Sequence, residues 1–249
     1  MLRCLYRWAA LAMLSTGLSA VSAVAQEPGS TTPVVVELFT SQGCSSCPPA
    51  DVLLGELSKR SNILALAFHV DYWDYIGWKD PFASSQFTQR QHDYARTLGL
   101  HMVYTPQMVI DGRIDAVGSD RTAVEQAIAA SAKQPKLAVT LRGDRASGYR
   151  VSVPQAEAGL AGPATVWLVL FDREHVTPVK RGENAGATLK DYNVVRAWRR
   201  LGEWTGAAAE LPVDVDSAAM VTGSYAVVIQ ADPVGPVLGA VRLTVDSGS

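Results

Sequence analysis

The sequence predicts two folded parts. Residues 34–133 are expected to form an α/β domain with the element order β-α-β-α-β-β-α, and residues 134–249 a smaller all-β, sandwich-like domain. In the first part, apolar runs typical of strands alternate with amphipathic helical segments, which favours parallel pairing. After residue 134, short strand-like stretches are separated by Gly, Pro, Asp and Ser, as in an antiparallel β-sandwich.

The first part contains seven expected elements. They are the strand Val34–Phe39, a helix from Pro48 to about Lys59, the strand Ile63–Val70, a helix from Ser84 or Ser85 to about Leu98, the strands Gln107–Ile110 and Arg113–Val117, and a helix capped by Ser119 or Asp120. A proline at the first helical position supports the first helix. Asp111-Gly112 predicts a hairpin, because both turn positions need a positive φ.

The second part contains six expected strands. They are Leu137–Leu141, Tyr149–Val153, Thr165–Phe171, Val194–Trp198, Tyr225–Ala231 and Val237–Val245. A polar patch formed by Arg181-Gly182-Glu183-Asn184 with Tyr192, Asn193 and Arg196 interrupts them. Two interpretations stay open for this patch: a structural loop between strands, or a binding loop that faces the cysteines.

Residues 1–25 have the pattern of a signal peptide. Arg3 and Arg7 precede a short apolar run, and Ala23-Val24-Ala25 fits a small-x-small cleavage site. The run is shorter than the roughly 20 residues that span a bilayer. We therefore expect cleavage near Ala25, a periplasmic or secreted location, a tether over residues 26–33, and no transmembrane segment in the mature chain.

Composition limits the classes of function. Hydrophobic residues make up 48% and charged residues 18% of the chain, which supports a sizeable core and excludes disorder as the main state. The net charge is −2, and loss of Arg3 and Arg7 with the signal peptide makes it more negative by two charges. No nucleic-acid partner is expected, because binders of nucleic acid normally carry a basic excess.

The mature chain keeps two cysteines, Cys44 and Cys47, where a strand gives way to a helix. A thiolate at a helix N-terminus is stabilised by unpaired backbone N–H groups and the helix dipole. The two-residue spacing lets Cys47 resolve a mixed disulfide formed by Cys44. We expect Cys44 to be the exposed nucleophile with a moderately lowered pKa, and Cys47 to be shielded. A static disulfide or half of a zinc site remain alternatives.

Thr105-Pro106 stands directly before the strand Gln107–Ile110. A proline there suggests either a cis bond lying against the cysteines or an ordinary trans proline that closes a loop. In the cis arrangement, the backbone of Thr105 is free to pair with an extended substrate.

Residues 34–51 and 103–112 together resemble the thioredoxin superfamily. The resemblance rests on the strand before the cysteines, on Cys44-Ser45-Ser46-Cys47-Pro48, and on the Thr-Pro-strand-Asp-Gly pattern that ends at Gly112. It implies a thioredoxin-like domain and thiol–disulfide exchange, with Cys44 attacking, Cys47 resolving and Pro106 as the cis proline. The whole mature chain resembles an exported bacterial thioredoxin-like family of unknown function. Gln42-Gly43 replaces the usual aromatic residue before the first cysteine.

Other side chains near the cysteines are weaker candidates. A buried Glu37 would take the proton of Cys47; the alternative is that Glu37 faces solvent or pairs with a lysine. Tyr72 and Trp73 are candidates for docking a partner chain, or they only cover the sheet. His69 would join the two thiolates in holding Cu(I).

Three functions follow from these residues. The leading hypothesis is an exported thiol–disulfide oxidoreductase with a reductase or isomerase bias, which acts on protein thiols and disulfides with a further redox partner and without a cofactor. The first alternative is a periplasmic copper-binding or metallochaperone module that uses Cys44, Cys47 and His69. The second is a non-enzymatic interaction protein with a static disulfide.

Overall fold

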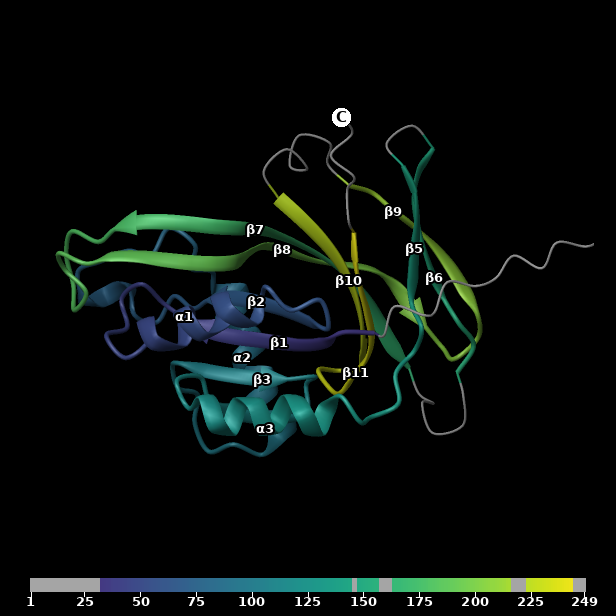
Figure 1. Cartoon of the computed structure of the whole chain (residues 1–249), viewed down its shortest axis with the longest axis horizontal. Coiled ribbons are helices and arrows are strands. Elements are labelled where there is room, and N and C mark those ends of the chain that lie inside the picture. Colours follow the sequence, from purple (N-terminus) through teal and green to yellow (C-terminus); the bar gives the residue numbers. More distant parts are fainter. Residues whose placement is uncertain (1–31, 145–146, 157–162, 216–222, 244–249) are drawn as a thin grey trace, which may run out of the picture. The chain divides into compact units, whose positions relative to one another are not determined.

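One mixed sheet of eight strands runs through both halves of the chain, in the order β11-β10-β7-β8-β2-β1-β3-β4 (Figure 1). A second sheet has the order β5-β6-β9. The computed structural model describes residues 32–144, 147–156, 163–215 and 223–243. The expected signal peptide, most of the tether and the end of the last expected strand lie outside the described residues.

The elements follow one another in a fixed order along the chain. They are β1 (Val34–Thr40), α1 (Pro48–Leu57), β2 (Ile63–His69), a 3₁₀ turn (Asp74–Ile76), α2 (Ser85–Leu98), β3 (Gln107–Ile110), β4 (Ile114–Val117), α3 (Arg121–Ser131), β5 (Thr140–Asp144), β6 (Gly148–Val153), β7 (Ala164–Pro178), β8 (Thr188–Trp204), β9 (Ala209–Val213), β10 (Gly223–Ala231) and β11 (Val237–Leu243). The first seven helices and strands therefore occur in the expected order.

Local chemistry explains where the helices begin. The hydroxyl of Ser84 accepts a hydrogen bond from the backbone of α2, and the carboxylate of Asp120 does the same for α3. Two prolines open α1, where the missing N–H groups cost no helical hydrogen bond. Asp111 and Gly112 have φ values of 48° and 63°, as the hairpin between β3 and β4 requires.

The expected fold class is wrong. Strands account for 43% and helices for 19% of the structure, and the second half does not form a small separate sandwich. Its long strands β7 and β8 instead extend the sheet of the first half, because β8 pairs in parallel with β2 at Ala67 and Val194. Strand β2 would otherwise leave one row of backbone groups unpaired. The expected domain boundary between residues 133 and 134 stays a prediction.

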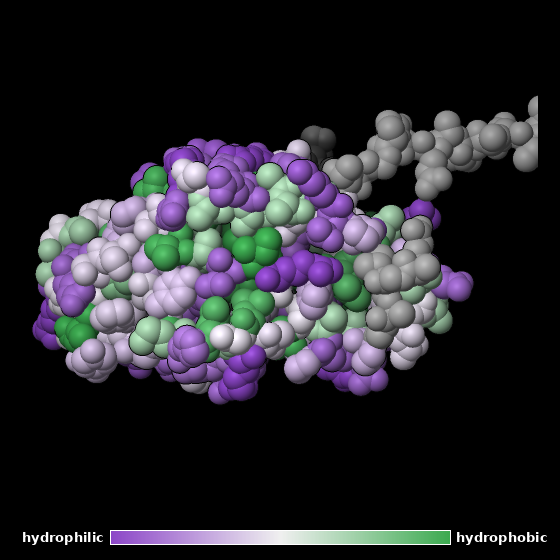
Figure 2. Space-filling view, turned by 90° about the horizontal axis from the view of Figure 1, so that it is seen from below, coloured by the Kyte–Doolittle hydropathy of each residue, from purple (hydrophilic) through white to green (hydrophobic). Residues whose placement is uncertain are grey.

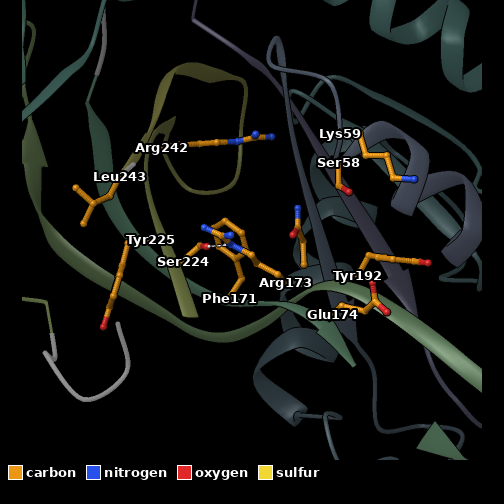
Figure 3. A pocket seen from close by; sticks show the side chains of 11 residues that line it. Ser58, Lys59, Phe171, Arg173, Glu174, Tyr192, Ser224, Tyr225, Arg242 and Leu243 are labelled. Atoms are coloured by element: carbon orange, nitrogen blue, oxygen red, sulfur yellow. Dashed lines mark hydrogen bonds between the residues drawn. The ribbon is translucent and has the colours of Figure 1, made fainter. Parts of the chain in front are cut away.

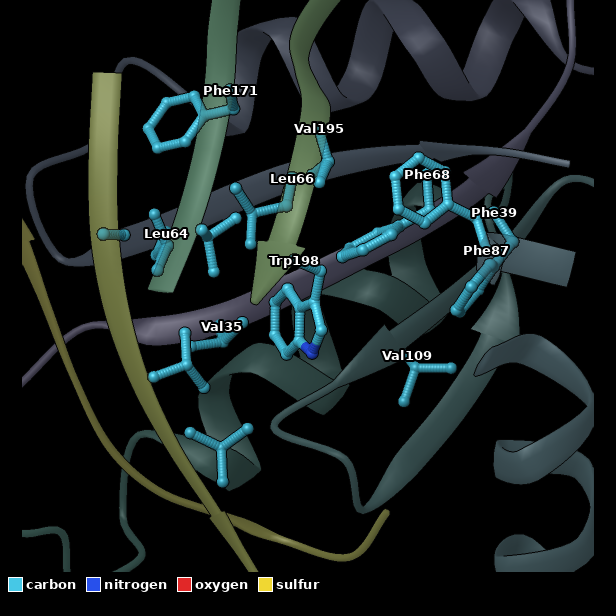
Figure 4. Packing of buried hydrophobic residues seen from close by; sticks show 14 of the residues in the cluster. Val35, Phe39, Leu64, Leu66, Phe68, Phe87, Val109, Phe171, Val195 and Trp198 are labelled. Carbon is cyan, nitrogen blue, oxygen red and sulfur yellow. The ribbon is translucent and has the colours of Figure 1, made fainter. Parts of the chain in front are cut away.

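Three hydrophobic clusters hold the sheets together. The first lies on one face of the large sheet, where Trp198 packs edge-on against Phe68 with ring centroids 5.6 Å apart (Figure 4). The second lies between the two sheets and includes Trp204 and Tyr225. The third lies under α1 and α3 and includes Leu38 and Leu54. Residues on alternate positions of β1 thus enter different clusters, as the period of a strand requires.

The face of the molecule seen from below carries small apolar patches separated by polar residues (Figure 2). Single exposed apolar side chains such as Tyr75 and Met102 are ordinary for a folded chain. Among the described residues, no helix is both long enough and apolar enough to cross a membrane.

Candidate functional site

Cys44 and Cys47 form a disulfide between the end of β1 and the start of α1. The S–S distance is 2.15 Å and the two Cα atoms lie 5.4 Å apart. Both residues are 0% exposed. The expectation that the sulfur of Cys44 is accessible is therefore wrong for this conformation, because other segments of the chain cover it.

Thr105 provides one of these covering contacts. Its hydroxyl lies 3.3 Å from Cys44 Sγ and accepts a hydrogen bond of 2.8 Å from the indole of Trp73. The Thr105–Pro106 peptide bond is cis, as one of the two interpretations of the sequence expected. Tyr72 lies beside Trp73, with ring centroids 6.1 Å apart, and both are half-buried. The two docking candidates thus lie close to the disulfide, although their role in docking stays a prediction.

The connection between β7 and β8, residues 179–187, contacts the backbone of the CxxC segment, and we call it the covering loop. Asn184 Nδ2 donates to the carbonyl oxygens of Gln42 and Cys44, each at 3.0 Å. The carboxylate of Glu183 accepts a hydrogen bond of 3.4 Å from the backbone N–H of Ser45. Because β7 and β8 are long, their tip reaches the CxxC segment (Figure 1). Part of the polar patch seen in the sequence therefore faces the cysteines.

The start of α1 offers fewer hydrogen-bond donors to a thiolate than a helix normally does. Pro48 and Pro49 have no backbone N–H, and the N–H groups of Ala50 and Asp51 both donate to the carbonyl of Cys47. Besides Cys47, two hydroxyl groups lie within hydrogen-bond distance of Cys44 Sγ: that of Ser46 at 3.4 Å and that of Thr105 at 3.3 Å. These hydroxyls stabilise a thiolate without adding positive charge.

A buried carboxyl group lies one helical turn after Cys47. Asp51 is almost fully buried and accepts a hydrogen bond of 2.9 Å from the hydroxyl of Thr40. Burial, followed by repulsion from Asp191, raises its pKa from 3.8 to about 8. Residues four apart on a helix share a face, so Asp51 and Cys47 lie on the same side of α1.

His69 lies in the same polar cluster, at the end of β2. Its Nδ1 is 2.7 Å from Asp80, and its Nε2 is 3.9 Å from Asp191 without a hydrogen-bond partner. Burial alone would lower the pKa of His69, but the charge and hydrogen bond of Asp80, together with the negative charges of Asp191 and Asp51, outweigh burial and raise it to about 9. Gln42 joins the carboxylates to the CxxC segment, since its backbone N–H donates to Asp80 and its side chain donates to Asp191.

Glu37 is held elsewhere. Arg90 Nε and Nη2 donate to its two carboxylate oxygens at 2.7 and 2.9 Å, and the hydroxyl of Tyr94 donates at 2.5 Å. On β1, Glu37 follows the alternation of Val35 and Phe39, which enter the first cluster rather than the one beneath α1. Its described hydrogen bonds include none to the CxxC segment, so the structure does not bring Glu37 together with Cys47.

The residues considered for copper do not converge in this conformation. The two sulfurs are joined in the disulfide, and the ring of His69 is engaged by Asp80. Within the described part of the chain, no group of three His, Cys, Asp or Glu residues has a geometry suited to a metal ion.

Comparison with known proteins assigns the family. A model of the family described as "Protein of unknown function (DUF1223)" matches residues 35–230, which is most of the chain. The chain belongs to the DUF1223 family. No curated protein matches it.

Two solved structures are similar to this DUF1223 chain. The crystal structure of a protein from Agrobacterium tumefaciens is 30% identical in sequence, covers 90% of this chain and 98% of its own, and has a TM-score of 0.73. HBP35 of Porphyromonas gingivalis is 12% identical, with 88% of this chain and 77% of that one covered and a TM-score of 0.57. The second likeness concerns the fold alone.

Sequence reasoning missed several residues around the disulfide of this DUF1223 protein. Asp80 and Asp191 both accept hydrogen bonds from Gln42, but they lie 38 and 149 residues from it in the sequence. No local pattern indicates such contacts. Asp51 could have been identified from the sequence, because it lies one turn after Cys47 on the helix face that carries Leu54. A carboxylate on a buried helix face is unusual.

Proposed function

We propose that this protein is an exported thiol–disulfide oxidoreductase in which Cys44 and Cys47 cycle between dithiol and disulfide. The observation that carries the proposal is the Cys44–Cys47 disulfide at the start of α1, with the hydroxyl of Thr105 3.3 Å from Cys44 Sγ. The resemblance of residues 34–51 and 103–112 to the thioredoxin superfamily supports the same chemistry at the level of sequence.

The exchange has two steps in the reducing direction. The Cys44 thiolate attacks one sulfur of a substrate disulfide, which forms a mixed disulfide and releases the other substrate sulfur as a thiolate that takes up a proton. The thiol of Cys47 then loses its proton and attacks Cys44 Sγ. This second step forms the Cys44–Cys47 disulfide, breaks the mixed disulfide and releases the second substrate thiol. Two electrons pass from the protein to the substrate.

Asp51 is the proposed acceptor of the Cys47 proton. With a pKa of about 8, its carboxyl group is ionised in about one molecule in ten at pH 7 and in more as pH rises; this carboxylate form is matched to a thiol of ordinary pKa, about 8.5, and can take its proton. Asp51 replaces Glu37 in this role, because the carboxylate of Glu37 is paired with Arg90.

The covering loop has to move before a substrate can reach the sulfurs, since both cysteines are 0% exposed. Among the described residues, the side-chain hydrogen bonds of Cys44 Sγ involve hydroxyl groups and no basic group, whereas strongly oxidising exchangers surround their thiolate with positive charge. We therefore propose a reductase or isomerase direction, with Tyr72 and Trp73 as the place where a substrate chain docks beside Thr105.

Turnover of a disulfide substrate tests the proposal. Reduced protein is mixed with insulin, and the loss of insulin disulfides is followed at pH 7. Cys44→Ser should abolish exchange, whereas Cys47→Ser should accumulate a mixed disulfide that is visible on a non-reducing gel. If the wild-type protein exchanges no faster than Cys44→Ser, the proposal fails.

The burial of both sulfurs favours a second candidate, a non-enzymatic protein with a static disulfide. The two candidates differ in how the bridge responds to glutathione, because a structural bridge resists the glutathione pool. Export is tested separately, by N-terminal sequencing of protein recovered outside the cytoplasm; we expect the mature chain to begin near residue 26.

A further inference from the structure

A cavity lies away from the disulfide, between the end of α1 and the strands β7, β8, β10 and β11 (Figure 3). Its volume is about 420 Å³, within the range of roughly 300–1,000 Å³ that is common for small-molecule sites. The sheet is irregular here. The pairing of β7 with β8 shifts at Phe171, and Asn193 on β8 has a φ of 49°. We call this cavity the cationic pocket.

Three basic side chains line the cationic pocket: Lys59, Arg173 and Arg242. None of them forms an ion pair with an acidic residue in the described part of the chain. Glu174 is the acidic residue on the lining, and its carboxylate lies 3.7 Å from Lys190. Among the described residues, the lining therefore carries more positive than negative charge, although the chain as a whole is acidic.

Arg242 is the most constrained of the three. Its Nη2 donates to the backbone carbonyl of Ile63, while its buried Nε has no hydrogen-bond partner. Burial lowers the pKa of Arg242, yet a guanidinium keeps its proton in proteins. A half-buried cation without an acidic partner is costly, and an anion bound in the pocket would compensate its charge. In Figure 3, the side chain of Arg242 extends from β11 into the space that separates it from α1, and Arg173 points toward Ser224.

We propose that the cationic pocket binds a small organic anion whose carboxylate or phosphate group pairs with Arg173 and Arg242. Forked guanidinium donors match the oxygens of both head groups. Lys59 adds a third positive charge from the end of α1. Phe171, Tyr192 and Leu243 are among the lining residues, and their apolar surface suits an apolar or aromatic body. The site shares no residue with the disulfide, so the proposal stands apart from the proposed exchange activity.

Calorimetric titration of the full mature chain tests this site with three matched probes: phenyl phosphate, benzoate and the neutral benzamide. We expect saturable binding of phenyl phosphate or benzoate and none of benzamide; the tighter of the two anions identifies the head group. The proposal is overturned if neither anion saturates the protein by about 10 mM, or if benzamide binds as tightly as the anions.

Substitutions locate the binding. Arg173→Gln and Lys59→Gln alter exposed side chains, so the fold is retained. Each should raise the dissociation constant of the tighter-binding anion about tenfold. Arg150→Gln removes an exposed arginine on β6, outside the pocket, and should leave binding unchanged. Equal weakening by Arg150→Gln would show diffuse attraction instead of a site. Disulfide exchange should be the same in all three variants, so failure of one proposal can be told from failure of the other.

Discussion

Asn184 holds the covering loop over the disulfide, so its replacement should make the sulfurs easier to reach. Its side-chain amide donates to the carbonyl oxygens of Gln42 and Cys44, both at 3.0 Å. Asn184→Ala removes both hydrogen bonds and leaves the pairing of β7 with β8 intact. A reductant attacks only the open state, because both cysteines are 0% exposed in the closed one.

The expected increase in the rate of disulfide reduction follows from these two hydrogen bonds. A hydrogen bond contributes about 1 kcal/mol net, so the loss of two shifts the closed–open equilibrium by about 2 kcal/mol. Since about 1.4 kcal/mol corresponds to tenfold, dithiothreitol should reduce Cys44–Cys47 about 30-fold faster in Asn184→Ala, provided that opening and closing are fast. The assay quenches reduction with an alkylating agent at timed intervals and counts the labelled cysteines by mass spectrometry.

Asn62→Ala is the matched control, because the side chain of Asn62 is exposed in the turn before β2. Its reduction rate should equal that of the wild type. An unchanged rate in Asn184→Ala, with the fold intact by circular dichroism, would refute the idea that the covering loop limits access to the sulfurs.

Three further predictions concern the groups around the disulfide and on the opposite face of β1. In the folded chain the carboxyl group of Asp51 keeps its proton up to a pKa of about 8, whereas in the unfolded chain its pKa is 3.8. The unfolded state therefore loses this proton first, and the free energy of unfolding falls as pH rises between these two values. Asp51→Asn should therefore reduce the fall in unfolding free energy between pH 5 and pH 8, measured with urea. Thr105→Val should raise the pKa of reduced Cys44 by about one unit, measured from the pH dependence of alkylation. Arg90→Met should cost about 3–5 kcal/mol, because it leaves the buried Glu37 without its cationic partner.

Matched variants check these expectations. Thr97→Val removes an exposed hydroxyl that donates to the carbonyl of Asp93 and should not change the pKa of Cys44. Arg96→Met breaks an exposed ion pair with the side chain of Asp93 and should cost no more than about 1 kcal/mol. A large loss from Arg96→Met, a small one from Arg90→Met, or an unchanged pH profile in Asp51→Asn would contradict the account of the corresponding group.

Local signals were sufficient for the elements up to α3. The apolar run Val34–Phe39, the proline that opens α1 and the Asp111-Gly112 turn depend on neighbours in sequence, and the corresponding elements are present. The fold class failed because it depends on pairing between distant segments. The polar outer halves of β7 and β8 lack an apolar alternation, so their length was underestimated, and β9 was missed.

The candidate site shows the same division. The Cys44–Cys47 pair and Thr105 were visible in sequence, since each follows a spacing pattern along the chain. The cover of the sulfurs was not, because Asn184 reaches Cys44 from 140 residues away. Glu37 looked suited to proton transfer, but strand alternation turns it toward Arg90 on the other face of the sheet.

The reduction potential of Cys44–Cys47 tests the central claim most directly. The full mature chain is equilibrated with graded ratios of reduced to oxidised glutathione and dithiothreitol, and the reduced fraction is read by alkylation and mass. A reversible transition between about −270 and −180 mV, the range of thioredoxin and protein disulfide isomerase, is the predicted result. A potential below about −300 mV would identify the bridge as structural and contradict the proposed exchange activity.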